Sequence, residues 1–375
     1  MIFRGELMRS LSAQGATVYA LAADYDDHWR AQVGALGARP IDISLDRTGV
    51  RPLRDFLDLL KLRGTLRKLR PDVQIGYFIK PVIYGSIAGM LARVPRRYAV
   101  IAGLGYVFTA GAERQGWKRK LLRLLVSSLY RIGLAACHRV FFLNPDDRQQ
   151  FIQMRLVPED KTVLLQGEGV PLDHFRPAPP VLQPPRYLLI ARLLREKGVA
   201  EFAEAARIVR ATCPEAEFHL VGGWDPNPGS LPLHQVEAWV QEGVIQWHGP
   251  VADVRPWIER CSVYVLPSYR EGKPRSTQEA MSMARPIITT DVPGCRDTVD
   301  EGVNGFKVPV RDVPALAEAL LRFVENPDLI ARMGAESRRI AEERFDVHQI
   351  NAVVMDVIGL SGGIGRNAAG APRSG

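Results

Sequence analysis

Two carboxylates, Glu271 and Glu279, have seven residues between them across a predicted junction between a loop and a helix. A strand-like run at 263–267 precedes them and another at 286–290 follows, which predicts the order strand, loop, helix, strand. Pro274 suits the first helical position, where its missing N–H costs no hydrogen bond. Free amides at a helix start attract an anion, and carboxylates accept hydrogen bonds from hydroxyl groups. The segment therefore suits a sugar nucleotide, which carries both groups, although acidic residues are also common at helix starts for their own sake.

Two cations, Arg192 and Lys197, follow a second predicted strand at 187–191. Ligands of open α/β sheets bind beyond the carboxyl ends of the strands. The fork of Arg192 and the point charge of Lys197 could neutralise a diphosphate there. A solvated, charged loop is the alternative, and it is favoured when the acidic motif downstream is left out of account.

Two glycines, Gly222 and Gly223, directly follow another predicted strand at 217–221. These two residues are interpreted either as part of the same ligand-binding edge or as an ordinary tight turn.

Composition describes a globular protein and excludes several classes. The chain has 375 residues, which favours two domains, and 46% hydrophobic residues. It contains no run of about 18 apolar residues and no secretory signal. The four cysteines and seven histidines show no metal-binding or redox spacing, so structural roles in a reduced cytosol are favoured for them.

Positive charge is concentrated in the first half of the chain. Residues 1–180 contain 27 Lys and Arg against 16 Asp and Glu, whereas the remainder contains 22 against 25. This asymmetry favours an anionic partner, either nucleic acid or a membrane surface. No nucleic-acid-binding motif is present, so the membrane is the favoured partner.

One helix, predicted over 117–134, could carry that contact. Its start is basic, and leucines with two flanking aromatic residues follow. It could lie in an anionic membrane interface. The alternative is a core-facing helix of the first domain with a solvated basic edge.

The pattern along the chain predicts two doubly wound α/β domains. They are expected over 1–178 and 186–345, joined by a proline-rich linker within 175–185, with a last helix at 346–360 that crosses back and a disordered tail at 361–375. The first half is predicted to contain helices at 3–14, 53–69, 84–92, 118–135 and 145–154 and strands at 18–23, 41–44, 73–78, 98–102 and 140–143. The second half adds helices at 199–211, 233–242, 254–260, 313–325 and 347–358 and a strand at 245–248. The chain opens in a helix, so the first domain is expected to lack its opening strand and glycine turn, or to begin upstream.

Three motifs in the second half occur in a recognisable order: the segment 192–198 (RLLREKG), Glu271 with Glu279, and 301–306 (EGVNGF) after Gly294. Together they resemble retaining glycosyltransferases of family 4, which have the GT-B fold of two Rossmann-like domains facing a cleft. In the first half, 79–86 and 103–108 resemble a bacterial subgroup that extends polyprenyl-diphosphate-linked glycans.

The resemblance implies a role for each matching residue. Glu271 would meet hydroxyls of the donor sugar beside Arg192 and Lys197, and Glu279 would meet the ribose. The donor-binding residues would also include Gly222, Gly249, Pro250, Val251, Gly272, Lys273, Pro274, Arg275 and Ser276, with the loop 249–251 lining the base. Lys80, Gly103 and Gly105 would lie on the acceptor side. No metal is expected, because cations and the helix start could carry the charge of the leaving group.

The predicted reaction moves a hexose or N-acetylhexosamine from a UDP-sugar to a lipid-linked glycan with retention, in capsule, O-antigen or exopolysaccharide synthesis. The enzyme is expected in the cytoplasm, peripheral on the inner membrane, and without a cofactor. No catalytic base is named, because 103–105 (GLG) stands where many relatives carry a histidine. The alternatives are a UDP-sugar epimerase of the same fold and an inactive nucleotide-sugar-binding protein.

Overall fold

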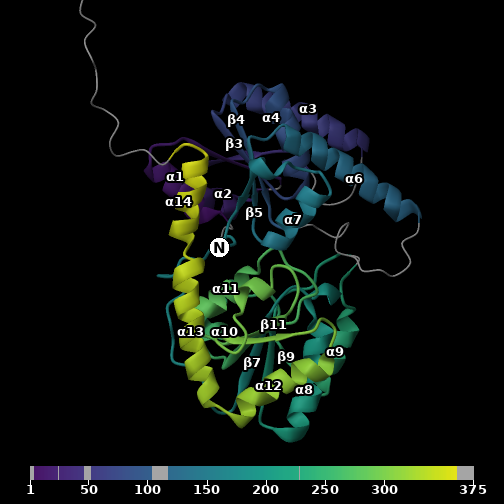
Figure 1. Ribbon diagram of the computed structural model, residues 1–375, viewed down its shortest axis with the longest axis vertical. Coiled ribbons are helices and arrows are strands. Elements are labelled where there is room, and N and C mark those ends of the chain that lie inside the picture. The colour runs from purple at the N-terminus through teal and green to yellow at the C-terminus, as the bar shows by residue number, and fades with distance from the viewer. Residues whose placement is uncertain (1–3, 24, 46–51, 104–116, 228, 361–375) are drawn as a thin grey trace, which may run out of the picture. The chain divides into compact units, whose positions relative to one another are not determined.

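The computed structural model describes residues 4–23, 25–45, 52–103, 117–227 and 229–360 (Figure 1). The chain forms two compact units. Unit 1 comprises Met1–Phe142, Gln149–Leu165 and His348–Gly375, and unit 2 comprises Leu143–Arg148 and Gln166–Val347. The expected tail at 361–375 and Gly105 lie outside the described residues.

Unit 1 contains two parallel sheets in its described part. Strands β1 (Val18–Ala22) and β2 (Ala38–Asp42) form one, and β3 (Val73–Tyr77), β4 (Arg96–Ile101), β5 (Arg139–Phe142) and β6 (Thr162–Leu164) form the other in sequence order. Its helices are α1 (Gly5–Ala13), α2 (Asp27–Ala35), α3 (Pro52–Leu69), α4 (Ser86–Leu91) after a π-helical turn at Pro81–Gly85, α6 (Trp117–Ala135), the α7 residues (Pro145–Gln153) from 149 onward, and α14 (Val347–Val357) from 348 onward.

The last helix, α14, is tied to the four-stranded sheet of unit 1. Arg96 Nη1 donates to the carbonyl oxygen of Ile358 at 2.6 Å, and the Tyr98 hydroxyl donates to that of Val357 at 3.3 Å. Both donors come from β4, so Val357 and Ile358 pack on a strand that contributes Ala99 and Ile101 to the hydrophobic core of this sheet.

Unit 2 is built on one six-stranded parallel sheet in the order β12–β11–β10–β7–β8–β9. The strands are β7 (Arg186–Ile190), β8 (Glu217–Val221), β9 (Gln246–Trp247), β10 (Val263–Leu266), β11 (Ile287–Thr290) and β12 (Gly305–Val308). The helices are α8 (Val199–Thr212), α9 (Leu233–Gln241), α10 (Arg255–Glu259), α11 (Arg275–Ser282), α12 (Val313–Glu325) and α13 (Asp328–Arg344). The chain first adds strands on one side of β7 and then, from β10, on the other. The order therefore reverses between β7 and β10, and open α/β sheets bind ligands beyond the carboxyl ends of the strands at such a point.

The proline-rich segment before β7 belongs to unit 2, and ahead of this segment the chain passes from unit 1 to unit 2 between Leu165 and Gln166. The segment is held on unit 2 by Arg285, whose fully buried guanidinium donates to the carbonyl oxygens of Ala178 and Pro179. Prolines lack N–H donors but keep their acceptors. Arg285 also donates to the carbonyls of Ile258 and Glu259, which joins the segment to α10.

Several elements were not predicted from the sequence, namely α2, α13, β6 and β12. Helix α13 is largely polar, with its buried Ile330, Met333 and Ile340 spread over three turns. Pro274 is the residue before α11 and has an extended backbone (φ −67°, ψ 121°), so the helix starts one residue later than expected.

Candidate active site in unit 2

The site expected from the sequence gathers at the carboxyl ends of β7 and β10, where the strand order reverses. The segment after β7 carries Arg192 and ends in a 3-10 turn at Arg195–Lys197, and the loop after β10 carries Glu271. The amide of Tyr269 donates to the carbonyl of Glu196 at 2.8 Å, so the two loops are bonded to each other. Residues 73 positions apart in the sequence are thereby brought together.

Lys197 and Glu271 form an ion pair between these loops. The Lys197 ammonium and the Ser268 hydroxyl, the latter at 2.7 Å, both donate to Oε1 of Glu271. The two charged side chains are mostly buried but still reach solvent. Such a pair presents a cation and a carboxylate side by side, the groups that a sugar diphosphate requires.

Two glycines allow this close approach. Gly198 has φ +71°, and a Cβ there would lie 2.1 Å from the carbonyl oxygen of Pro267. Gly294 has φ +79°, and a Cβ there would lie 2.3 Å from the carbonyl oxygen of Glu271 and 2.7 Å from that of Gly272. Larger residues would therefore push the loop that carries Glu271 away from its neighbours.

The start of α11 holds the second carboxylate. Glu279 accepts a hydrogen bond from Arg275 Nε at 2.9 Å, one turn away. Burial raises the pKa of Glu279, and the positive charge of Arg275 opposes that rise. The Tyr264 hydroxyl of β10 donates to the Ser276 hydroxyl at 2.6 Å, which holds the first turn of α11 against the sheet.

Both carboxylates act on that tyrosine. Burial raises the pKa of Tyr264, and the negative charges of Glu279 and Glu271 raise it further. The charge of each acid therefore disfavours ionisation of the same buried hydroxyl.

Arg192 lies toward the β8 side of the same edge, where its Nη1 contacts Oδ2 of Asp225 at 2.5 Å. Its side chain is more than half exposed, unlike that of Lys197. Gly222 sits beneath it with φ +147°, and a Cβ there would lie 1.8 Å from the carbonyl oxygen of Ala191. Gly222 is therefore required by the close packing of two strand ends.

The expected base-binding loop joins this edge after β9. The amide of Gly222 donates to the carbonyl of Gly249 at 2.8 Å, and a Cβ on Gly223 would make ordinary contact with the side chain of Pro250. The Trp247 indole donates to the carbonyl of Gly222 at 2.8 Å. The residues Gly249, Pro250 and Val251 are thus held beside the ends of β7 and β8.

A histidine pair beside that loop was not expected. Nδ1 of His219 lies 3.1 Å from Nε2 of His248, and Nε2 of His219 lies 3.1 Å from Glu217. The His248 ring packs at 4.0 Å between centroids against Trp257. Burial lowers the pKa of both histidines, and the neighbouring His219 lowers that of His248 further. The sequence places His219 in one predicted strand and His248 at the end of the next, and these two strands pair in the sheet.

Lys273 differs from the prediction. Its side chain is buried, with Nζ 3.6 Å from Asp297 and 5.8 Å from the centre of the Phe345 ring. Burial lowers the pKa of Lys273, and Asp297 opposes this. Its ammonium therefore points into unit 2 and not to the open start of α11, because the loop residue before Pro274 turns inward.

Among the expected acceptor-side residues, Lys80 also has a structural partner. Its ammonium contacts Oδ1 of Asp55 at 2.7 Å, and both side chains are largely buried. The Tyr84 hydroxyl donates to the same carboxylate, and burial together with Asp55 raises the pKa of Tyr84 to about 12. Gly103 follows β4 with φ +128°. The prediction for Gly105 stays a prediction, since that residue is outside the described part of the chain.

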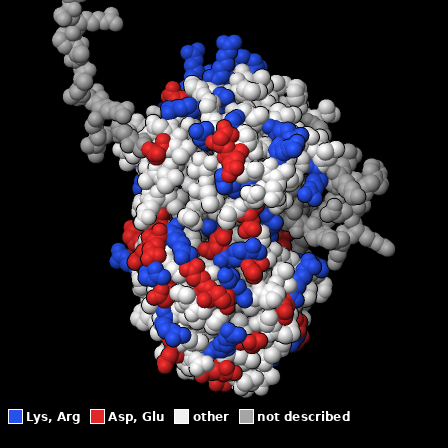
Figure 2. Space-filling model, in the orientation of Figure 1, with Lys and Arg blue, Asp and Glu red and all other residues white. Residues whose placement is uncertain are grey.

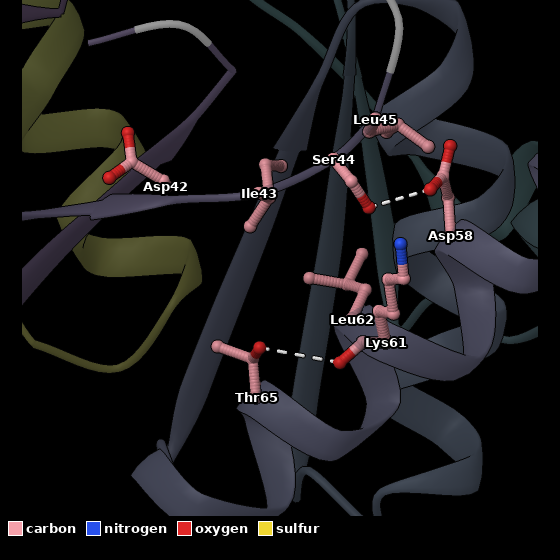
Figure 3. A pocket seen from close by; sticks show the side chains of 8 residues that line it. All are labelled: Asp42, Ile43, Ser44, Leu45, Asp58, Lys61, Leu62 and Thr65. Carbon is pink, nitrogen blue, oxygen red and sulfur yellow. Dashed lines mark hydrogen bonds between the residues drawn. The ribbon is translucent and has the colours of Figure 1, made fainter.

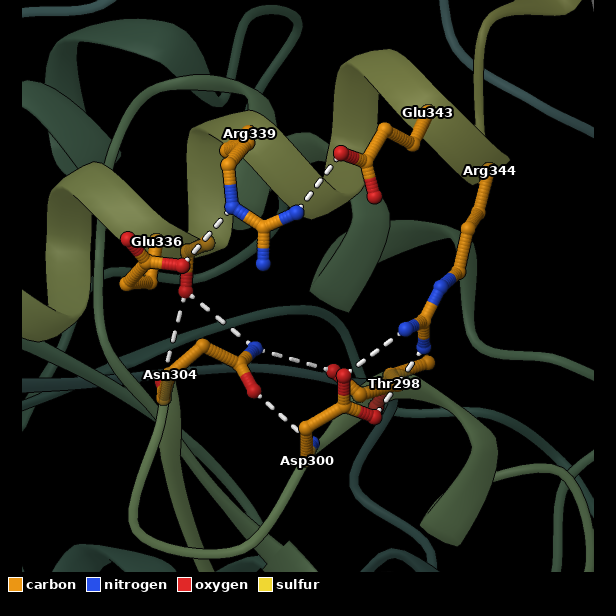
Figure 4. A network of polar contacts seen from close by, with 8 residues as sticks. Thr298, Asp300, Asn304, Glu336, Arg339, Glu343 and Arg344 are labelled. Atoms are coloured by element: carbon orange, nitrogen blue, oxygen red, sulfur yellow. Dashed lines mark hydrogen bonds and ion pairs between the residues drawn. The ribbon is translucent and has the colours of Figure 1, made fainter.

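The third motif is structural (Figure 4). The Asn304 amide donates to the carbonyl of Thr298 at 3.1 Å and accepts from the amide of Asp300 at 2.8 Å. Asp300 in turn accepts two hydrogen bonds from Arg344 at the end of α13, which lowers its pKa. The motif therefore fastens a turn before β12 to a helix.

Unit 1 has a cavity of about 360 Å³ between the segment after β2 and one side of α3 (Figure 3). Asp58 and Ser44 form a hydrogen bond of 2.6 Å in its wall. Within the described residues no three His, Cys, Asp or Glu side chains are placed to hold a metal ion. None of the described helices combines the length and the apolar character needed to cross a bilayer.

Comparison of the backbone with solved structures identifies the fold class. A sucrose-phosphate synthase from Thermosynechococcus elongatus matches with a TM-score of 0.74 and 21% identity, covering 94% of this chain and 90% of that one. The Anabaena protein Alr3699/HepE, solved in complex with UDP and glucose, matches with a TM-score of 0.73 and 17% identity over 95% of both chains. The chain has the GT-B fold of glycosyltransferases.

Sequence comparison identifies the family. Residues 184–326 match the family described as "Glycosyl transferases group 1", and residues 3–167 match a "Glycosyl transferase 4-like domain". The protein belongs to these glycosyltransferases. It is 26% identical, over 87% of both chains, to the N,N'-diacetylbacillosaminyl-diphospho-undecaprenol alpha-1,3-N-acetylgalactosaminyltransferase of Campylobacter jejuni. It is 25% identical, over 73% of this chain and 72% of the relative, to the UDP-Gal:alpha-D-GlcNAc-diphosphoundecaprenol alpha-1,3-galactosyltransferase of Escherichia coli.

Proposed function

We propose that the protein transfers a hexose or N-acetylhexosamine from a UDP-sugar to a polyprenyl-diphosphate-linked glycan, with retention of anomeric configuration. The observation that carries this proposal is the Lys197–Glu271 pair at the point where the strand order of unit 2 reverses. Support for the acceptor class comes from the two relatives whose names specify diphospho-undecaprenol acceptors. Capsule, O-antigen or exopolysaccharide synthesis is the matching biological setting.

The donor would bind across the carboxyl edge of the unit 2 sheet. Its diphosphate would meet the ammonium of Lys197, the guanidinium of Arg192 and the free amides at the start of α11. Glu271 would accept hydrogen bonds from the sugar hydroxyls and Glu279 from the ribose. The loop 249–251 would line the base.

The chemical step would be a displacement on the face from which the diphosphate leaves. The bond between the anomeric carbon and the diphosphate oxygen breaks as the acceptor oxygen bonds to that carbon, and the hydroxyl proton passes to the departing oxygen. Cations placed where negative charge grows stabilise such a transition state, so no metal is required for this proposal.

The acceptor would be drawn from a membrane, so we place the enzyme at the cytoplasmic face of the inner membrane. The basic surplus of residues 1–180 supports contact with anionic lipid.

The test is release of UDP from UDP-sugars with and without an undecaprenyl-diphosphate-linked glycan. UDP release only when the acceptor is present, with a product of unchanged anomeric configuration by NMR, is the expected result. Interconversion of donors without acceptor would instead identify an epimerase, and an inverted product would refute retention. Binding of UDP without either reaction would identify an inactive binding protein.

A further inference from the structure

Helix α3 of unit 1 has an inner face that holds both of its acidic residues. Asp55 and Asp58 are buried, with 2% and 3% of their surface exposed. Asp55 is bonded to Lys80 at 2.7 Å, and Asp58 accepts a hydrogen bond from Ser44 at 2.6 Å (Figure 3). Leu59, Leu62 and Leu66 are buried on the same side. These contacts determine which side of the helix faces outward.

The outward side carries an apolar stripe. The exposed fractions are 85% for Leu53, 57% for Phe56, 56% for Leu57 and 42% for Leu60. Their spacing of three and four residues places them on one face over two turns. Soluble proteins rarely expose a contiguous apolar patch of this kind without a partner.

Cations flank this stripe. The helix also carries five basic residues, namely Arg54, Lys61, Arg63, Arg67 and Lys68. Arg54, Arg67 and Lys68 are exposed, whereas Lys61 lines the cavity of Figure 3 beside Asp58 and Arg63 is half-buried, so the outward side combines the apolar stripe with three exposed cations and neither acid. That combination is typical of helices that lie in the interface of an anionic membrane.

A second copy of this chain fits the stripe less well. In a two-fold symmetric contact each basic flank would meet the same patch of the other copy. Like charges would then be brought together, whereas anionic headgroups would neutralise them. On the face shown in Figure 2, Lys and Arg side chains gather at one end of unit 1, whereas both signs alternate over unit 2.

Helix α6, for which membrane contact was predicted from the sequence, exposes fewer large apolar side chains than α3 in its described part. Leu124, Leu125 and Ile132 are exposed there and share one side of the helix, but they are three residues against the four of α3. Arg131 of this helix donates to the carbonyls of Met154 and Arg155 and so serves the fold of unit 1.

We infer that the outer face of α3 docks the protein on an anionic bilayer, with Leu53, Phe56, Leu57 and Leu60 entering the interface and the cations on the headgroups. This inference deepens the proposed function, on which it rests, because it names the surface that brings unit 1 to a membrane-bound acceptor.

The experiment measures co-sedimentation of the full chain with vesicles of phosphatidylcholine alone or mixed with phosphatidylglycerol. The wild type is expected to prefer the anionic vesicles by about tenfold or more, since each Lys or Arg near such a surface adds to binding. The variant L53Q/L57Q is expected to lose most of this binding, and R67Q/K68Q to lose the preference for anionic lipid. The matched control I208Q replaces an exposed aliphatic residue of α8 in unit 2 and is expected to bind as the wild type does.

Unchanged vesicle binding by L53Q/L57Q, with retained thermal unfolding, would overturn the inference. Equal binding of the wild type to neutral and anionic vesicles would also overturn it. Loss of a wild-type dimer in L53Q/L57Q, measured by sedimentation, would assign the stripe to self-association instead. The proposed function is tested separately with a short-chain, water-soluble acceptor: L53Q/L57Q is expected to keep its turnover on that acceptor and to lose it on acceptor embedded in vesicles. Absence of turnover by the wild type on both acceptors would refute the proposed function and leave the vesicle result standing.

Discussion

Two clusters of polar side chains in unit 2, one around Asn304 and one around Lys197 and Glu271, come from sequence motifs rich in polar residues. They differ in whether they reach solvent. The side chain of Asn304 is fully buried and forms hydrogen bonds with Thr298, Asp300 and Ser337. At the strand ends, Lys197 and Ser268 both bond to Oε1 of Glu271, and the charged pair reaches solvent. A polar group whose hydrogen bonds are satisfied inside the protein contributes to folding, whereas one at an open sheet edge can bind a ligand.

The largest effect is expected from the open cluster. Lys197→Ala and Glu271→Gln should lower kcat/KM by about 10²–10³, because a preorganised charge at a developing anion is worth about 3–4 kcal/mol. Arg192→Ala should also lower turnover. Initial rates of UDP release measure this, with thermal unfolding as the control. A matching loss of stability and no specific loss of turnover would make this cluster structural, like that of Asn304.

Asn304→Ala sharpens the comparison from the other side. It removes bonds to the carbonyl of Thr298 and the amide of Asp300 in the interior, so the free energy of unfolding should fall by about 2–4 kcal/mol. Turnover per folded molecule should stay the same. Denaturant titration measures the first quantity, and Val303→Ala at an exposed neighbouring position is the control. If Asn304→Ala lost activity and kept its full stability, the motif around Asn304 would instead belong to the active site.

Glu279, the buried carboxylate at the start of α11, tests the proposed ribose contact. Glu279→Ala should weaken UDP binding about tenfold, or about 1.4 kcal/mol, by removing the acceptor proposed for the ribose hydroxyls. Isothermal titration with UDP measures it. The control is Glu325→Ala, at the end of α12. UDP affinity equal to that of the wild type would remove Glu279 from the donor site.

The smallest effect is expected from the histidine pair. Because the pKa values of His219 and His248 are lowered on folding, the folded state favours their neutral forms. Their contribution to stability is therefore present above the ordinary histidine pKa of about 6.5 and is lost as pH falls below it. Thermal unfolding from pH 7 to pH 5 should show this loss, and His248→Gln should reduce it. A variant with the same pH dependence as the wild type would show that the pair does not titrate in this range.

The strands and most helices could be predicted from periodicity, because buried strands of a parallel sheet are apolar throughout. The βαβ unit around Glu271 is an example, and its strands fall within one residue of the prediction. Helix α13 was not predicted because its buried side, although regularly spaced, includes Gly334 and Ser337, which weaken the apolar pattern. The packing of the proline-rich segment on unit 2 could not be predicted, because the buried donor that binds its carbonyls, Arg285, lies more than 100 residues away.

The sequence by itself determined which chemical groups the proposed site contains, namely two acids, two cations and the free amides of a helix start. Tertiary structure alone decided which of these groups remain open to a ligand. It turned Lys273 and Lys80 inward to Asp297 and Asp55 and left Lys197 and Glu271 at the sheet edge. The physical reason is that burying a charge requires a partner from elsewhere in the fold, and the sequence does not state where that partner will lie.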